Sequence, residues 1–199
     1  MKTKDLILTA LFAALTAVGA FLRVPTPISS FTLQVFFCCL AGVLLGPKYG
    51  ALSQLVYILL GLAGLPIFTT GGGLGVLVRP TAGFILGLVP LAAVSGALAR
   101  RWGGGFWAIC AACLVGEVLF YAIGLPYMHL VLTLYLQKQQ TVWQTVWGGM
   151  LIFLPWDCLK IVACGLVGKR LLPLRQREAA QQRNQDGQHS RRAEDGQKD

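Results

Sequence analysis

The sequence is poor in charged residues. Only 13% of its 199 residues are Asp, Glu, Lys or Arg, whereas 55% are hydrophobic, and the mean hydropathy is +0.64. Soluble domains carry about 25% charged residues, so the composition excludes that class and indicates a polytopic membrane protein. The net charge of +9 comes from 17 basic against 8 acidic residues. Basic residues gather in the cytoplasmic loops of membrane proteins, so we prefer this explanation to nucleic-acid binding.

The sequence also lacks the motifs of several function classes. It contains no HExxH, GxSxG or P-loop pattern, so we do not expect it to bind ATP itself, and energised transport would need a partner. The six cysteines all lie in apolar segments and are expected as small buried side chains. Cys110 and Cys113 have CxxC spacing, but no second pair or nearby His completes a metal site, and His129 stands alone. We expect neither metal nor cofactor.

Apolar runs predict an all-α integral membrane protein with six transmembrane helices. The first run resembles a signal peptide, but the runs that follow favour a membrane span. We expect Pro126 to interrupt the fifth helix. The expected spans cover 6–22, 31–45, 51–65, 81–98 and 106–124, with a sixth that begins within 142–153 or at Pro155 and ends at Lys169–Arg170. Residues 1–172 would form the membrane domain, and 173–199 a disordered, charged cytoplasmic tail.

Basic residues in alternate loops predict the orientation, with both termini in the cytoplasm. The outer side would hold Arg23, Arg79 and Lys138. The inner side would hold nine basic residues, namely Lys2, Lys4, Lys48, Arg100, Arg101, Lys169, Arg170, Arg175 and Arg177. The segment 68–83 is too rich in glycine for a helix and too apolar for an aqueous linker, so we expect an ordered outer loop at the membrane face. A flexible linker is the alternative.

Charged residues inside the spans are the best candidates for a site. Asp157 and Lys160 stand at i and i+3 of an apolar helix, where they could neutralise each other or meet a polar ligand. Arg79 could be a second cation near the same end, or an anchor at the membrane interface. Glu117 could be a protonated packing residue, the partner of a cation, or part of a proton path.

Small residues at spacing of four indicate close helix contacts. Two alanine rows in the first span would allow another helix to approach, or would serve internal packing. Two glycine pairs with the same spacing are interpreted as internal contacts. The alanine rows are Ala10/Ala14 and Ala13/Ala17, and the glycine pairs are Gly42/Gly46 and Gly83/Gly87.

Six segments, in order and at matching spacing, resemble one known family. They are Phe31–Gln34, Leu45–Ala51, Gly61–Pro66, Gly71–Gly75, Pro80–Phe84 and Leu154–Lys160. The chain resembles, over about residues 5–172, the BioY family of biotin-specific substrate-binding subunits (S components) of energy-coupling factor (ECF) transporters. The family pattern usually has glycine where this chain has Trp156 and Ala82.

The resemblance implies the six-helix S-component fold in the plasma membrane. Biotin would bind at the extracytoplasmic side, between the first outer loop and the glycine-rich loop. Asp157 and Lys160, with Gln34 and Arg79, would hold its polar ends, while Phe84 and Tyr121 would supply an apolar wall. The alanine rows, Ala10, Ala13, Ala14 and Ala17, would contact a transmembrane coupling subunit that carries the ATPase subunits.

Three alternatives remain open at this point. The chain could capture another vitamin, could be a membrane enzyme that uses Glu117, Asp157 and Lys160, or could be a structural anchor. The missing nucleophile or metal motif counts against the enzyme, so no catalytic residue is assigned, and the intramembrane charges count against the anchor. Whether the chain acts alone or as a homo-oligomer is also open.

Overall fold

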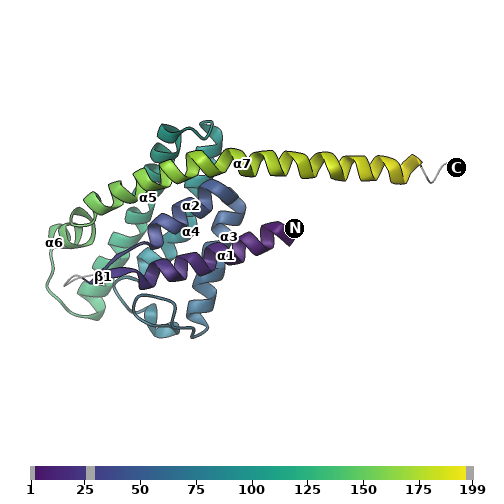
Figure 1. The fold of residues 1–199 in the computed structure, drawn as a ribbon. Helices are drawn as coiled ribbons and strands as arrows, with labels where there is room; N and C mark the ends of the chain where they lie inside the picture. Colours follow the sequence, from purple (N-terminus) through teal and green to yellow (C-terminus); the bar gives the residue numbers. More distant parts are fainter. Residues whose placement is uncertain (1–2, 26–29, 196–199) are drawn as a thin grey trace.

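The fold is almost entirely helical (Figure 1). The structure is a computed structural model that describes residues 3–25 and 30–195, with side chains described over 3–23 and 32–175. Two short strands form an antiparallel hairpin, and η2 and η3 are single π-helical segments. The elements are α1 (Thr3–Phe21), β1 (Arg23–Pro25), β2 (Ser30–Thr32), α2 (Gln34–Leu45), α3 (Pro47–Leu62), η1 (Leu74–Val76), α4 (Ala82–Arg101), α5 (Phe106–Leu130), η2 (Val131–Tyr135), α6 (Val142–Val146), η3 (Trp147–Leu151) and α7 (Leu154–Asp195). The all-α prediction is confirmed.

The six expected spans correspond to α1 to α5 and α7. In the described chain, four helical stretches are long and apolar enough to cross a membrane: Thr3–Phe21, Ala82–Arg101, Phe106–Tyr135 and Val142–Arg175. With 12 and 16 residues, α2 and α3 are shorter. At 1.5 Å per residue they measure about 18 and about 24 Å, less than a hydrocarbon core of about 30 Å. Residues 30–32, expected at the start of the second span, form β2 instead.

The short helix α2 lies at the centre of the packing. It contacts α1, α3, α4 and α7, and most of its residues are buried. Gly42 allows this arrangement, because a Cβ there would collide with the carbonyl oxygen of Ala92 on α4. Gly83 packs in the same way against Tyr127 on α5. Both glycine pairs therefore contain an internal helix contact, as expected.

Two expectations about helix ends differ from the structure. Pro126 does not end the fifth span, since α5 continues to Leu130 and passes into η2. Membrane helices tolerate proline where neighbouring groups satisfy the freed backbone. The tail, expected to be disordered, is helical to Asp195 and extends α7 away from the body (Figure 1). Its Ala, Glu, Gln and Arg residues favour helix. The boundary at residue 172 remains a prediction.

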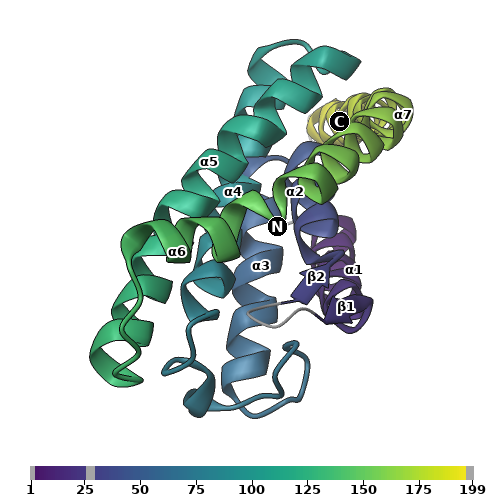
Figure 2. The ribbon, with the colours of Figure 1, turned by 90° about the vertical axis from the view of Figure 1, so that its left-hand side faces the viewer.

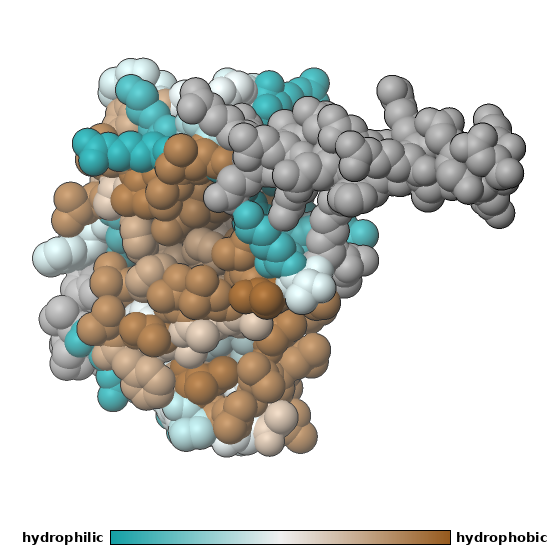
Figure 3. All heavy atoms as spheres, turned by 45° about the vertical axis from the view of Figure 1, so that its right-hand side comes forward, coloured by the Kyte–Doolittle hydropathy of each residue, from teal (hydrophilic) through white to brown (hydrophobic). Residues whose placement is uncertain are grey.

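The charges at the two ends of the bundle agree with the expected loop order. At one end, Arg175 pairs with Asp5 at 3.2 Å, and Arg100 donates to the carbonyl of Leu45 at 2.7 Å. The termini of α1, α2 and α4 therefore meet α7 there. At the other end, Arg23 donates to the carbonyl of Thr69. A broad hydrophobic surface is visible in Figure 3, with hydrophilic side chains beside the start of the α7 extension.

Candidate functional site

Asp157 lies in the first turn of α7, close to the π-helical segment η3. Pro155 suits this first turn because its missing N–H has no partner there in any helix. The backbone N–H of Asp157 donates to the carbonyl of Phe153 at 3.0 Å. Helix N-termini favour negative charge, so the fold itself supports a carboxylate at this position. The Asp157 residue is only 4% exposed.

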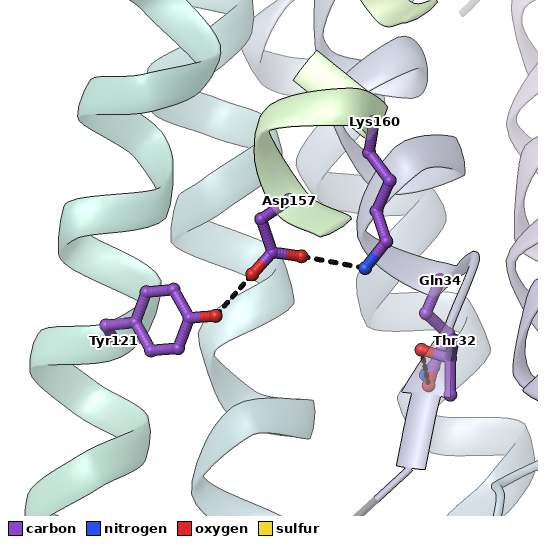
Figure 4. A network of polar contacts seen from close by, with 5 residues as sticks. All are labelled: Thr32, Gln34, Tyr121, Asp157 and Lys160. Carbon is purple, nitrogen blue, oxygen red and sulfur yellow. Dashed lines mark hydrogen bonds and ion pairs between the residues drawn. The ribbon is translucent and has the colours of Figure 1, made fainter. Parts of the chain in front are cut away.

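Both oxygens of the Asp157 carboxylate have partners (Figure 4). The Lys160 ammonium lies 2.7 Å from Oδ1, and the hydroxyl of Tyr121 on α5 donates to Oδ2. The Lys160 side chain is 10% exposed. The structure therefore brings together three of the expected site residues. Tyr121 was expected as apolar wall only, and its hydrogen bond to Asp157 is an additional role.

Gln34 stands at the start of α2, and its side chain points toward Thr32 (Figure 4). Its Nε2 donates to the hydroxyl of Tyr57 at 2.8 Å, and that hydroxyl donates to the carbonyl of Ile67 at 3.2 Å. A longer contact of 3.5 Å joins Oε1 to the hydroxyl of Thr32 in β2. Sequence reasoning missed Tyr57. The available signal was a phenol group within an apolar span, three residues after the polar pair Ser53 and Gln54.

Aromatic residues form the apolar side of the cluster. The ring centroids of Phe84 and Tyr121 lie 6.0 Å apart with an interplanar angle of 82°, and Phe120 is 5.3 Å from Phe84. Phe84 thus occupies the position expected of an apolar wall. Arg79 does not join the cluster. It is exposed and lies in the turn between η1 and α4.

The glycine-rich loop is ordered and packs on α3. Phe68 is 2% exposed and makes an edge contact with Tyr57, with centroids 5.3 Å apart. Gly73 has a φ of 90° and donates to the carbonyl of Gly61 at 2.7 Å. Glycine adopts this backbone conformation without strain. The bond from Arg23 to Thr69 joins the loop after α1 to this one, so the flexible-linker alternative is wrong.

A cavity of about 670 Å³ lies among α5, α6, η3 and α7, and Tyr121 is one of its lining residues. The helix α6 crosses α5 in this region (Figure 2). Most of the lining is apolar, with Glu117 and Tyr121 as its members nearest to the polar cluster. His129, which also lines the cavity, has its Nδ1 3.0 Å from the hydroxyl of Thr145. Pockets of about 300–1,000 Å³ are typical for small ligands.

The two alanine rows of α1 face in different directions. Ala10 and Ala14 are exposed, next to exposed apolar residues such as Ile7 and Val18. Ala13 is 4% exposed and belongs to the hydrophobic core, and the partly buried Ala17 packs against this core. The expectation that both rows contact a partner is therefore wrong for Ala13, because this chain's own helices already cover it.

The described residues contain no group of three or more His, Cys, Asp or Glu side chains that could hold a metal ion. Cys110 and Cys113 do not face one site together. Cys113 has its Sγ 3.8 Å from that of Cys164 on α7, whereas the thiol of Cys110 approaches the carbonyl of Ile161.

Comparison with known proteins agrees with the resemblance seen in the sequence. A probable biotin transporter BioY of Lysinibacillus sphaericus is 38% identical over 171 residues, which covers 85% of this chain and 87% of the relative. The biotin transporter BioY of Thermotoga maritima is 37% identical over 172 residues, covering 86% and 97%. These relatives are transporters by name.

A solved structure has the same fold. The S-component for biotin from an ECF-type ABC transporter superposes with a TM-score of 0.74 at 23% identity, covering 86% of this chain and 94% of the other. The S-component fold expected from the sequence is thereby confirmed. The sequence model of the BioY family matches residues 1–177. This multi-pass membrane protein therefore belongs to the BioY family.

Proposed function

We propose that this protein is the biotin-binding subunit of an ECF-type importer. In this proposal it captures biotin at the extracytoplasmic side and releases it to the cytoplasm when partner ATPase subunits act through a transmembrane coupling subunit. The buried cluster of Asp157, Tyr121 and Lys160 carries the proposal. A charged pair within apolar helices is unfavourable unless it serves a cavity, a partner or a ligand.

The chemistry of the cluster suits biotin. Biotin has a ureido group with N–H donors and a carbonyl acceptor, an apolar sulfur-containing ring, and a carboxylate on an aliphatic chain. Asp157 can accept from the ureido N–H groups, and Lys160 and the Gln34 amide can donate to oxygen atoms. Phe84 and Tyr121 offer aromatic surface to the ring system. The relatives named biotin transporters support this choice of ligand over other vitamins.

Capture from outside follows from the position of the cluster and the expected orientation. The polar cluster lies toward the end of the bundle that holds β1, β2 and the glycine-rich loop, opposite the end where Arg100 and Arg175 gather. Because basic residues mark the cytoplasmic side, the loops beside the site would face outward. Both termini would then be cytoplasmic.

The exposed row Ala10/Ala14 is the proposed contact with the coupling subunit. Two alanines four residues apart let a partner helix approach closely, and the neighbouring exposed side chains are apolar. An Ala14→Trp substitution should abolish uptake by the assembled transporter and leave biotin binding unchanged, because Ala14 lies on the exposed face of α1. Uptake in cells and binding to the purified subunit measure the two properties separately. Loss of binding would contradict this assignment.

Equilibrium binding of biotin to the purified protein in detergent tests the proposed function. Asp157→Asn and Lys160→Ala should both bind at least about tenfold more weakly, since each removes a charged partner whose hydrogen bonds contribute about 1.5–3 kcal/mol and leaves the other unpaired. Cys158→Ala is the matched control, because Cys158 is the exposed neighbour of Asp157 on α7. It should bind like the parent.

A folded parent protein that binds no biotin would overturn the assignment, and binding of another vitamin would then identify the true ligand. Turnover of the bound compound would instead favour the membrane enzyme. Full affinity in both charge variants would leave biotin as ligand but move its site away from α7.

A further inference from the structure

Glu117 is a buried carboxyl group beside the proposed site that takes no part in its hydrogen bonds. It lies on α5, one helical turn before Tyr121, and the residue is 3% exposed. Its Oε1 atom is fully buried and has no hydrogen-bond partner in the described part of the chain. The cavity beside it is lined mainly by apolar side chains, and neither lysine nor arginine is among its lining residues, which include His129.

The charges around Glu117 do not balance if it is ionised. Asp157 and Lys160 already compensate each other at 2.7 Å. Glu117 lies four residues before Tyr121, on the same face of α5, and Tyr121 donates to Asp157. Among the residues that the structure describes, no lysine or arginine forms an ion pair with Glu117. An unpaired, desolvated carboxylate is strongly unfavourable, so we infer that Glu117 carries a proton in the unliganded protein.

A bound anion changes this balance. Lys160 is the cation of the cluster, and its charge is already matched by Asp157. A bound anionic ligand adds one negative charge to a cluster whose charges already match, and an ionised Glu117 would add another in a medium of low dielectric constant. We propose that Glu117 determines the specificity of the site for an anionic ligand, which it admits while protonated and repels when ionised. This inference rests on the proposed capture of biotin.

Other ionisable groups also lie near Glu117 or line the same cavity. They are Tyr121, Cys113 and His129 on α5, Cys38 and Cys39 on α2, and Asp157 and Lys160 on α7. Two residues of α4, Leu91 and Ser95, pack against α5 at Gly116, next to Glu117. Neither has an ionisable side chain. All of these groups remain in a Glu117→Gln variant, which replaces the carboxyl by an amide of the same shape. The difference between parent and variant therefore isolates Glu117.

The test compares biotin with its uncharged methyl ester, on the parent and on Glu117→Gln, from about pH 5 to about pH 9, where buried carboxyl groups titrate. The affinity of the parent for biotin should fall by about tenfold or more as pH rises, since one unit of linked titration corresponds to a factor of about ten. Glu117→Gln should keep the affinity of the low-pH parent throughout. The ester should show no such decline with either protein.

The outcomes separate this inference from the proposed function. A folded parent that binds biotin at no pH overturns the proposed function. Biotin binding whose decline is the same in Glu117→Gln, or is shared by the ester, overturns only the role of Glu117. If the variant does not fold, calorimetry of the parent in two buffers with different heats of ionisation decides. Uptake of about one proton on biotin binding at the upper pH is expected, and no uptake would contradict the inference.

Discussion

Two of the polar clusters that are buried between the helices differ in charge. Between α1 and α3, the Gln54 amide donates to the hydroxyls of Thr16 and Ser53 at 3.2 and 3.0 Å. Between α5 and α7, Asp157 binds Tyr121 and Lys160. Neutral hydrogen bonds are a common means of joining membrane helices. A buried ion pair adds little net stability and can often be replaced by apolar residues. The neutral cluster therefore explains helix association, whereas the charged one indicates a ligand.

The largest effect is expected at the charged pair, where substitutions can separate a role in stability from a role in ligand binding. Lys160→Met leaves Asp157 without its cation and should lower the free energy of unfolding by about 3–5 kcal/mol. The double substitution Asp157→Leu with Lys160→Met should restore most of that stability, because no buried charge remains. Both proteins should fail to bind biotin. Thermal unfolding and equilibrium binding in one detergent measure the two effects.

A double variant that stays as unstable as Lys160→Met would mean that loss of the hydrogen bond from Tyr121 to Asp157, which joins α5 to α7, costs as much stability as the unpaired carboxylate. A double variant that still binds biotin would mean that Asp157 and Lys160 merely neutralise each other.

A smaller effect is expected at Tyr121. Tyr121→Phe keeps the aromatic contact with Phe84 but removes the hydrogen bond to the Asp157 carboxylate. Hydrogen bonds to charged groups contribute about 1.5–3 kcal/mol, so biotin should bind about tenfold to a hundredfold more weakly. Phe120→Leu is the control, since it changes an aromatic contact of Phe84 without removing a polar atom. An affinity loss in the control but not in Tyr121→Phe would assign Tyr121 to packing alone.

The smallest effect is expected in the neutral cluster. Gln54→Leu removes two hydrogen bonds, but Thr16 and Ser53 keep their own bonds to the carbonyls of Phe12 and Gly50. The buried Oε1 of Gln54, which has no partner in the described residues, disappears as well. Stability should therefore change by less than about 1 kcal/mol, in line with side-chain hydrogen bonds in membrane proteins. Biotin affinity should not change. A large loss of biotin affinity in Gln54→Leu would mean that the neutral cluster also contributes to ligand binding.

The sequence predicted what depends on local patterns. Apolar runs located the helices, and the spacing of Asp157 and Lys160 placed both on one face of α7. The glycine content of 68–83 indicated an ordered loop. Contacts between distant segments were less accessible. The hydrogen bond from Gln34 to Tyr57, and the burial of Ala13 against exposure of Ala14, depend on how each helix is rotated toward its neighbours. Pro126 was misjudged because a local rule for proline does not include the tertiary partners of a membrane helix.

The most direct test of the central claim is a structure of this protein with biotin bound. The account predicts that biotin lies between the start of α7 and the start of α2, with polar atoms at hydrogen-bond distance from Asp157 and Lys160. Phe84 and Tyr121 would cover its rings. Biotin in the cavity of about 670 Å³ among α5, α6, η3 and α7, with the Asp157–Lys160 pair untouched, would contradict the account.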